Sequence, residues 1–148
     1  SDRTRHEVDL AQRFPMPFRQ EVVAAAREAG IDPATVYGLI RQESRFVTDA
    51  RSHVGAAGLM QVMPRTARWT ARRIGFDWKP EMANDRAINL RLGTTYLKFV
   101  LEDFGGSVPM DAAAYNAGLG AVRRGAIPAS TQRYVERVLS VYRAWRRG

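Results

Sequence analysis

Helix start and stop signals recur along this chain, whereas the alternation of apolar and polar residues that marks a half-buried strand is almost absent. Gly30 ends an apolar helical face, and Asp32 followed by Pro33 supplies the cap and first-turn residue of another helix. These helix start and stop signals constrain the fold more than any other feature of the sequence. We therefore predict a mainly α protein with little or no strand.

The spacing of apolar residues places the expected helices. We expect Asn84 to cap the longest internal helix, and Ser130 or Thr131 to cap the last one. The stretch between the second and third helices is too irregular for a long helix, although Leu59–Met63 can form one turn. The predicted helices cover about residues 17–29, 33–46, 64–74, 85–104, 109–117 and 131–145.

Length and composition exclude several classes of protein. A chain of 148 residues with 45% hydrophobic content can bury one sizeable core, and no linker-like stretch divides it, so we expect one compact domain and a monomer. No apolar run approaches the roughly 20 residues of a membrane span, and the start has neither Met nor an apolar signal segment. We expect a soluble chain from a longer precursor, without stable membrane insertion. With no cysteine and only His6 and His53 as imidazoles, no metal or organic cofactor is implied.

The charge balance points to an anionic partner. The formal net charge is +8, and nearly all of the excess is arginine, since Lys79 and Lys98 are the only lysines. The basic C-terminal segment could be taken for a nucleic-acid helix, but Tyr134, Val138 and Trp145 fall on one of its faces. We interpret that face as core and predict no nucleic-acid partner.

One carboxylate follows an apolar face. Val36, Leu39 and Ile40 form the i, i+3, i+4 stripe of the second predicted helix, and the next position on that stripe is Glu43. Burial among apolar side chains would raise the pKa of this carboxyl, as a general acid near neutral pH requires. The alternative is a structural acid paired with one of the neighbouring arginines.

The segment GAAGLMQVMP after this helix has the character of a binding loop. Gly55 and Gly58 let the backbone approach a ligand, Met60 and Met63 offer flexible apolar surface, and Gln61 can both donate and accept a hydrogen bond. A sugar ring, with an apolar face and polar edges, suits such a surface. Methionines at helical spacing are also ordinary core residues, so the loop by itself leaves both interpretations open.

Four blocks together resemble a known family. ESRF, SHVGAAGLMQVMPRTA, NLRLGTTYL and AAYNAG occur in the order and spacing of the catalytic domain of the soluble lytic transglycosylases, lysozyme-like enzymes that cut bacterial peptidoglycan. The blocks run from Glu43 to Gly118, roughly half of the chain. The resemblance implies a lysozyme-like domain over 1–148, with a leading helical segment (1–30), a motif-bearing core (31–118) and a shortened loop with the C-terminal helix (119–148).

The resemblance also implies a mechanism with a single acid/base, Glu43. In that family the acid protonates the glycosidic oxygen between N-acetylmuramic acid and N-acetylglucosamine, and its carboxylate then takes the proton from the C6 hydroxyl as that oxygen attacks C1. The product carries a 1,6-anhydromuramyl end and no water is consumed. Most glycosidases need a second carboxylate. We expect none here, and interpret Asp49 and Asp111 as solvated residues.

Substrate-binding roles carry over by position. The resemblance places Ser52 near the reacting N-acetyl group, although Ser52 could instead cap a turn. Met63 and Tyr115 match substrate-binding positions, but either could be core. The full set of substrate-binding residues implied by the family is Ser52, Gly58, Leu59, Met60, Gln61, Met63, Ala114, Tyr115, Asn116 and Tyr134.

The chain departs from the family after Gly118, where the segment LGAVRRGAIPASTQRYV keeps Ile127-Pro128 and Tyr134-Val135 but has a short loop without the family's acidic residue. The resemblance implies peptidoglycan glycan strands as partner and the periplasm or cell envelope as location. Two alternatives remain at this point: a hydrolytic lysozyme of the goose type, and a non-catalytic glycan-binding module.

Overall fold

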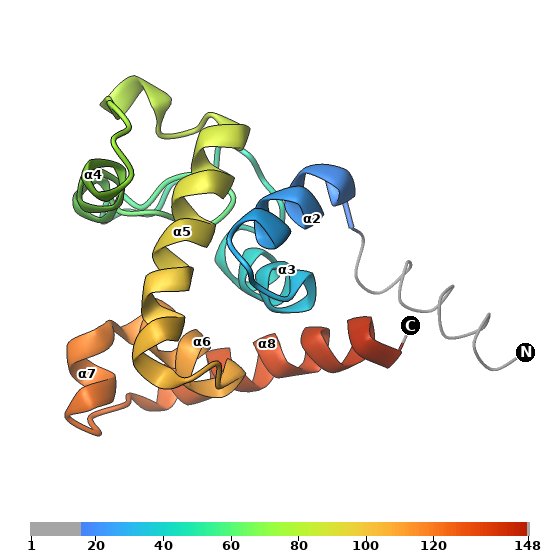
Figure 1. Cartoon of the computed structure of the whole chain (residues 1–148). Helices are drawn as coiled ribbons and strands as arrows, with labels where there is room; N and C mark the ends of the chain where they lie inside the picture. Colours follow the sequence, from blue (N-terminus) through green and yellow to red (C-terminus); the bar gives the residue numbers. More distant parts are fainter. Residues whose placement is uncertain (1–15, 148) are drawn as a thin grey trace, which may run out of the picture.

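The computed structural model describes residues 16–147, so His6 and the first half of the predicted leading segment lie outside the described residues. Figure 1 shows their arrangement as a set of helices, with a long irregular segment between the second and third of them. The elements are α2 (Arg19–Glu28), α3 (Pro33–Glu43), α4 (Pro64–Arg73), the 3-10 helix η1 (Pro80–Met82), α5 (Arg86–Phe104), α6 (Val108–Ala117), α7 (Leu119–Arg123) and α8 (Ala129–Arg147).

The prediction of a mainly α protein is confirmed for the described residues. The only β pairings between residues 16 and 147 are isolated antiparallel bridges, in which Ala57 pairs with Arg51 and with Val62. Both bridges lie in the irregular segment between α3 and α4, where they fold the loop back on itself. None of the helices between residues 16 and 147 has the length and apolar composition needed to cross a bilayer.

The start of α3 follows the predicted local chemistry. The Asp32 carboxylate accepts a hydrogen bond from the Ala34 amide at 2.9 Å, and Pro33 occupies the first turn. Ile31 and Val36 are both buried in the main core cluster. The end of α3 was predicted near Phe46, but the helix stops at Glu43, because Arg45 and Phe46 adopt left-handed backbone with φ of 51° and 67°.

Two predicted helix caps are wrong. The cap of α5 is Asp85, whose carboxylate accepts from the Ile88 amide at 3.0 Å, and Asn84 lies one residue too early. The last helix already begins at Ala129, so Ser130 and Thr131 lie inside its first turn. Asp is as good a cap as Asn, and the sequence alone did not separate the two neighbours.

The core lies where α3 crosses α8. Leu39, Ile40 and Val138 are fully buried in it. A Cβ placed on Gly38 would lie 2.9 Å from the Val138 carbonyl oxygen, so the missing side chain at Gly38 lets the two backbones approach closely. Figure 1 shows α8 running the length of the molecule beneath α3. This crossing places the first half of α8 beside the C-terminal end of α3.

The C-terminal helix packs its aromatic face inward, as predicted. Tyr134 and Val138 are buried, and Trp145 stacks on the buried Tyr37 with ring centroids 4.7 Å apart. The face of α8 that carries these side chains therefore packs against the rest of the domain.

Asp111 contradicts the expectation of a solvated residue. Its side chain, in the first turns of α6, is fully buried, and neither carboxylate oxygen has a hydrogen-bond partner. Burial raises its pKa to about 7. The sequence placed it at a helix start, where acids are usually exposed, and did not show that this face of α6 packs inward.

We predict that Asp111→Ala stabilises the protein at alkaline pH. The folded-state pKa of Asp111 lies above its ordinary value, so the folded state loses stability as the pH rises from about 4 to about 7, and this loss stays constant at higher pH. Removing the carboxyl should raise the free energy of unfolding at pH 8 by about 2 kcal/mol, after the cost of a small cavity. Urea unfolding at pH 5 and pH 8 checks this, with the exposed Asp49→Ala as control. A variant that is less stable than the parent at pH 8 would contradict the account.

Candidate active site

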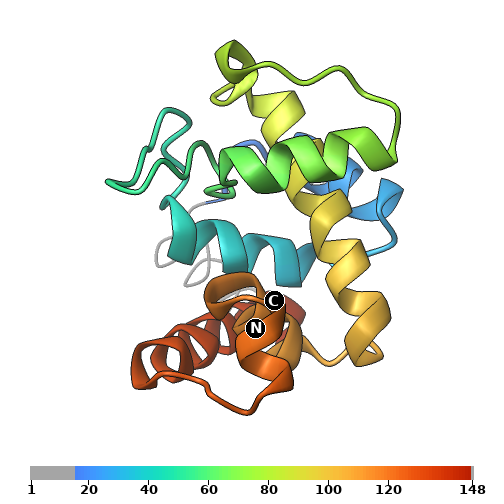
Figure 2. The ribbon, with the colours of Figure 1, turned by 90° about the vertical axis from the view of Figure 1, so that its left-hand side faces the viewer.

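The site predicted around Glu43 is built from four parts of the chain. These are the C-terminal end of α3, the loop from residue 44 to residue 63, the C-terminal half of α6 and the first turns of α8. Figure 2 shows α3 between α4 above and α6 and α7 below, with the loop beside its C-terminal end. Residues more than 90 positions apart in the sequence therefore meet at the end of α3.

Glu43 is half-buried and held by a phenol. The Tyr134 hydroxyl donates a hydrogen bond of 2.6 Å to its Oε2 atom. Burial raises the pKa of Glu43 to about 7, and the hydrogen bond from Tyr134 lowers it in part. The side chain therefore exists in both protonation states near neutral pH, as an acid that must later act as a base requires.

A second phenol stands close to Glu43. The pKa of Tyr115 lies well above its ordinary value, mainly because of burial and secondly because of the nearby Glu43 carboxylate. This phenol therefore stays protonated. The Tyr115 hydroxyl donates to the Met60 carbonyl oxygen at 2.6 Å. Tyr115 therefore links α6 to the loop beside Glu43, and its side chain is half-buried between them.

No other carboxylate joins Glu43 among the described residues. Asp49 is exposed, as predicted, and the buried Asp111 has no recorded interaction with Glu43. Between residues 16 and 147, no three histidine, aspartate or glutamate side chains come together as metal ligands would.

Ser44 fixes the turn that follows Glu43. Its buried hydroxyl donates to the Leu59 carbonyl oxygen at 2.7 Å and accepts from the Phe46 amide at 3.2 Å. These bonds hold Arg45 and Phe46 in their left-handed conformation, which costs energy for side chains of this size. Ser44 thus joins the end of α3 to the loop, a link that the sequence reasoning missed.

Asn89 is a second residue that the sequence reasoning missed. Its side-chain nitrogen donates to the Ala57 carbonyl at 2.8 Å, and its oxygen accepts from the Met60 amide at 2.9 Å. Asn89 therefore holds the backbone of the loop against α5. A signal was present, because Asn89 falls on the Ile88, Leu92 stripe of α5, just as Glu43 falls on the stripe of α3.

The polar residues predicted to bind substrate also order the loop. The Ser52 hydroxyl accepts from the Ala56 amide at 3.0 Å, which is the turn-capping role left open above. The Gln61 side-chain nitrogen donates to the carbonyl oxygens of Ala50 at 3.0 Å and Gly58 at 2.9 Å. A direct contact of Ser52 or Gln61 with a sugar stays a prediction.

The apolar residues of the predicted set divide into buried and exposed ones. Leu59, Met60 and Ala114 have fully buried side chains, so any contact they make with a ligand is through the backbone. Met63, which precedes α4, is 38% exposed and can present its thioether to a ligand. Gly58 is buried and has a left-handed backbone, with φ of 80°.

Asn116 links the two helices that carry the phenols. The Thr131 hydroxyl donates to the Asn116 side-chain oxygen at 2.7 Å. Asn116 follows Tyr115 in α6, and Thr131 lies one turn before Tyr134 in α8. The bond therefore fixes the end of α6 against the start of α8, next to both phenols, and it leaves the Asn116 amide nitrogen available for a ligand.

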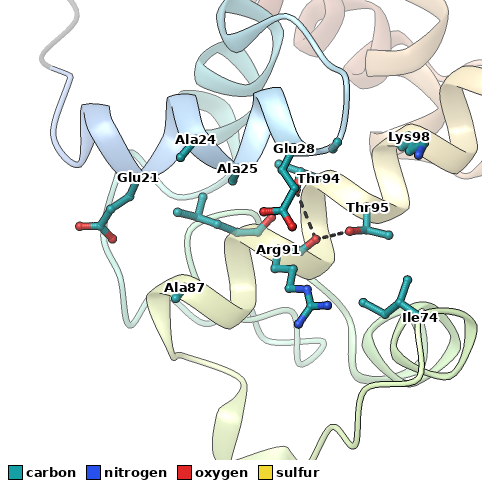
Figure 3. Close-up of a pocket in the computed structure, with 12 residues that line it drawn as sticks. Glu21, Ala24, Ala25, Glu28, Ile74, Ala87, Arg91, Thr94, Thr95 and Lys98 are labelled. Atoms are coloured by element: carbon teal, nitrogen blue, oxygen red, sulfur yellow. Dashed lines mark hydrogen bonds between the residues drawn. The ribbon is translucent and has the colours of Figure 1, made fainter.

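The hollow between α2 and α5 is a poor alternative site. It has a volume of about 500 Å³, and Figure 3 shows alanines, Glu28, Arg91 and Thr95 along its walls. The Thr95 hydroxyl is already used, because it donates to the Arg91 carbonyl oxygen at 2.6 Å. No residue of the set predicted for substrate binding lines this hollow.

We predict that Tyr134→Phe moves the pH dependence of activity upward. The Tyr134 hydrogen bond lowers the pKa of Glu43, so its loss should raise that pKa further. Glu43 must be protonated to act as the acid. The alkaline limb of the rate profile should therefore shift to higher pH, while the rate of glycan cleavage falls. Rates of glycan cleavage from pH 5 to pH 9 would show this. An unchanged limb would mean that Tyr134 does not act on Glu43.

Comparison with known proteins identifies the family to which this chain belongs. Residues 21–134 match the family described as Transglycosylase SLT domain. The soluble lytic murein transglycosylase of Salmonella typhimurium is 36% identical over 116 residues, which cover 77% of this chain and 18% of that protein. The membrane-bound lytic murein transglycosylase C of Actinobacillus pleuropneumoniae is 37% identical over 126 residues, 78% of this chain and 33% of that protein.

Solved structures show the same fold. An inactive mutant of the lytic transglycosylase Slt from Pseudomonas aeruginosa aligns with a TM-score of 0.85 at 37% identity, over 90% of this chain and 24% of that one. The 70 kDa soluble lytic transglycosylase of Escherichia coli aligns with a TM-score of 0.86 at 32% identity, over 93% of this chain and 25% of that one. This chain thus spans a third or less of the length of these relatives. It belongs to the transglycosylase SLT domain family.

Proposed function

We propose that this chain is a lytic transglycosylase that cleaves the β-1,4 bond between N-acetylmuramic acid and N-acetylglucosamine in peptidoglycan. The observation that carries the proposal is the half-buried Glu43, with its pKa raised to about 7 and its Oε2 held by Tyr134. Family membership supports it, because the relatives are lytic murein transglycosylases.

Glu43 acts first as the acid. Protonated in the bound complex, it gives its proton to the glycosidic oxygen as the bond to C1 of the muramic acid breaks, and N-acetylglucosamine leaves with that oxygen. The N-acetyl group of the substrate, rather than a second carboxylate, stabilises the positive charge that develops at C1. This agrees with the absence of another acid among the recorded contacts of Glu43 in the described residues.

Glu43 then acts as the base. Its carboxylate takes the proton of the C6 hydroxyl while the C6 oxygen attacks C1, which closes the 1,6-anhydro ring and returns Glu43 to its protonated form. Protons balance over the cycle and no water enters. Tyr134 donates to the carboxylate formed between the two steps, so it stabilises the intermediate form of the residue.

The surroundings of Glu43 serve substrate binding. The loop around Gly58 and Gln61 offers backbone and amide groups to the sugars, and Met63 offers apolar surface. The net charge of +8 would draw the protein to the anionic cell wall. Activity would then fall with salt through slower encounter. The relatives are murein transglycosylases, which supports a location in the periplasm or cell envelope.

Mass spectrometry of digested peptidoglycan tests the proposal. We expect soluble fragments that end in 1,6-anhydromuramic acid. Fragments with reducing ends would instead identify a hydrolytic lysozyme, and binding to insoluble peptidoglycan without release of fragments would identify a non-catalytic module. Either of those results would refute the transglycosylase activity while leaving the fold assignment intact.

A further inference from the structure

A line of aromatic rings leads away from the Glu43 site along α4 and α5. Tyr115, beside Glu43, lies 5.9 Å from the Tyr96 ring, and Tyr96 lies 6.1 Å from the Trp69 ring. Phe99 packs edge-on against Trp69 at 5.6 Å. The rings therefore form a continuous row, in which Tyr96 lies between Tyr115 and Trp69.

Trp69 is exposed, which distinguishes it from the other aromatic residues whose side chains the structure describes. It is 39% exposed, and it is the only aromatic side chain among those the structure describes that reaches the surface to this extent. Tyr96 and Phe99 are half-buried beneath it and hold it in place. A large exposed ring held rigid by neighbouring rings is typical of a binding surface.

An arginine completes the patch. The Arg73 guanidinium lies 3.8 Å from the centre of the Trp69 ring, one turn along α4. Arginine–aromatic pairs occur elsewhere in the chain, such as Arg68 over Trp78 and Arg91 over Phe76, but their rings are half-buried core residues. The ion pairs recorded for the described residues do not involve Arg73. Its positive charge is therefore presented at the surface beside an exposed ring.

We propose that Trp69 and Arg73 form a remote subsite for the glycan strand, in which the exposed part of the Trp69 side chain packs against a sugar ring and Arg73 pairs with a carboxylate that the strand carries. This rests on the proposed function, and it names which part of the substrate binds away from the cut. Sugars present an apolar face to aromatic rings, and guanidinium groups recognise carboxylates in a fixed geometry. In peptidoglycan, the peptide attached to the muramic lactyl group supplies the carboxylates.

The position of the subsite predicts dependence on strand length. Trp69 is separated from the Glu43 site by the rings of Tyr115 and Tyr96, so a sugar at Trp69 is not one of the two joined by the reacting bond. Only strands that extend beyond those two sugars can reach it. Binding energy gained there helps to hold the reacting sugar in place, so its loss lowers turnover on long strands as well as affinity.

Calorimetric titration of Glu43→Gln protein, which holds the substrate uncleaved, tests the subsite. The probes are a two-sugar and an eight-sugar peptidoglycan fragment with peptides, and a neutral N-acetylglucosamine oligomer of the same length as the longer one. Adding Trp69→Ala should weaken binding of both long probes about tenfold and leave the short one unchanged. Trp69→Phe should give intermediate affinities, and thermal unfolding checks that each variant is folded.

Arg73→Gln separates the two parts of the subsite. It should weaken binding of the long peptidoglycan fragment and leave the neutral oligomer unchanged, whereas the control Arg68→Gln, also on α4 and also over a tryptophan, should change neither. Equal affinity of Trp69→Ala and its parent for the long probes would overturn the subsite alone. A parent protein that binds none of the probes would refute the proposed function, and the subsite with it.

Discussion

Glu43→Gln is expected to abolish peptidoglycan cleavage while leaving glycan binding and the fold intact. Glutamine has the shape of the protonated acid and can keep the bond to Tyr134, but it has no proton to transfer in either step. General acid–base catalysis contributes roughly 10²–10⁴-fold to a rate, and here one residue supplies both halves. The loss should lie at or beyond the upper end of that range, measured as release of soluble fragments.

The stability of this variant provides the control. Wild-type Glu43 is charged above pH 7 at the cost of burial, so the neutral glutamine should be as stable as the parent at pH 8, or slightly more so. Thermal unfolding of both proteins would exclude loss of structure as the cause of inactivity. Turnover near the parent rate in a folded Glu43→Gln protein would remove Glu43 from the mechanism.

Gly58→Val is expected to reduce activity almost as strongly, through the loop rather than through the acid. Gly58 has φ of 80°, and a Cβ there would lie 2.3 Å from the Asn89 side-chain nitrogen. Asn89 is held by the Ala57 carbonyl and the Met60 amide, so it cannot move without releasing the loop beside Glu43. We expect a stability loss of about 3 kcal/mol and cleavage reduced by at least 10²-fold.

Gly55→Val is the matched control for this change. Gly55 also has a left-handed backbone, with φ of 94°, but a Cβ there would meet nothing within 4 Å. Its substitution carries the backbone strain without the clash, so it should cost about 1–2 kcal/mol and spare more of the activity. If both variants lost equal activity and stability, strain alone would explain the effect and the Asn89 contact would carry no special weight.

Local patterns in the sequence predicted much of the fold. The cap at Asp32, the stop at Gly30 and the burial of the Leu39, Ile40 stripe need only short-range chemistry, and all three are found. The predictions that were wrong concern features that depend on long-range packing. The sequence does not show which face of α6 turns inward, so Asp111 was taken for a solvated residue, although it is buried.

The sequence predicted Glu43 as the centre of the candidate site. It did not predict the residues that hold the surrounding loop and helices in place. Glu43 stood out because it interrupts an apolar stripe, and its pKa is raised as expected. Ser44 and Asn89 act through bonds to carbonyl and amide groups of a loop 15 and 29–32 residues away, which spacing along the chain cannot reveal. The Asn116 bond to Thr131 likewise joins two helices that meet only in the folded protein.

Digestion of peptidoglycan in heavy-oxygen water tests the central claim most directly, because it asks which oxygen attacks C1. If the C6 hydroxyl attacks while Glu43 serves as base, the released fragments carry no label and weigh one water molecule less than the hydrolysis product. Unlabelled 1,6-anhydro ends that disappear with Glu43→Gln are the result we predict. Fragments with the heavy oxygen at C1 would show that water attacks, and would contradict the proposed mechanism.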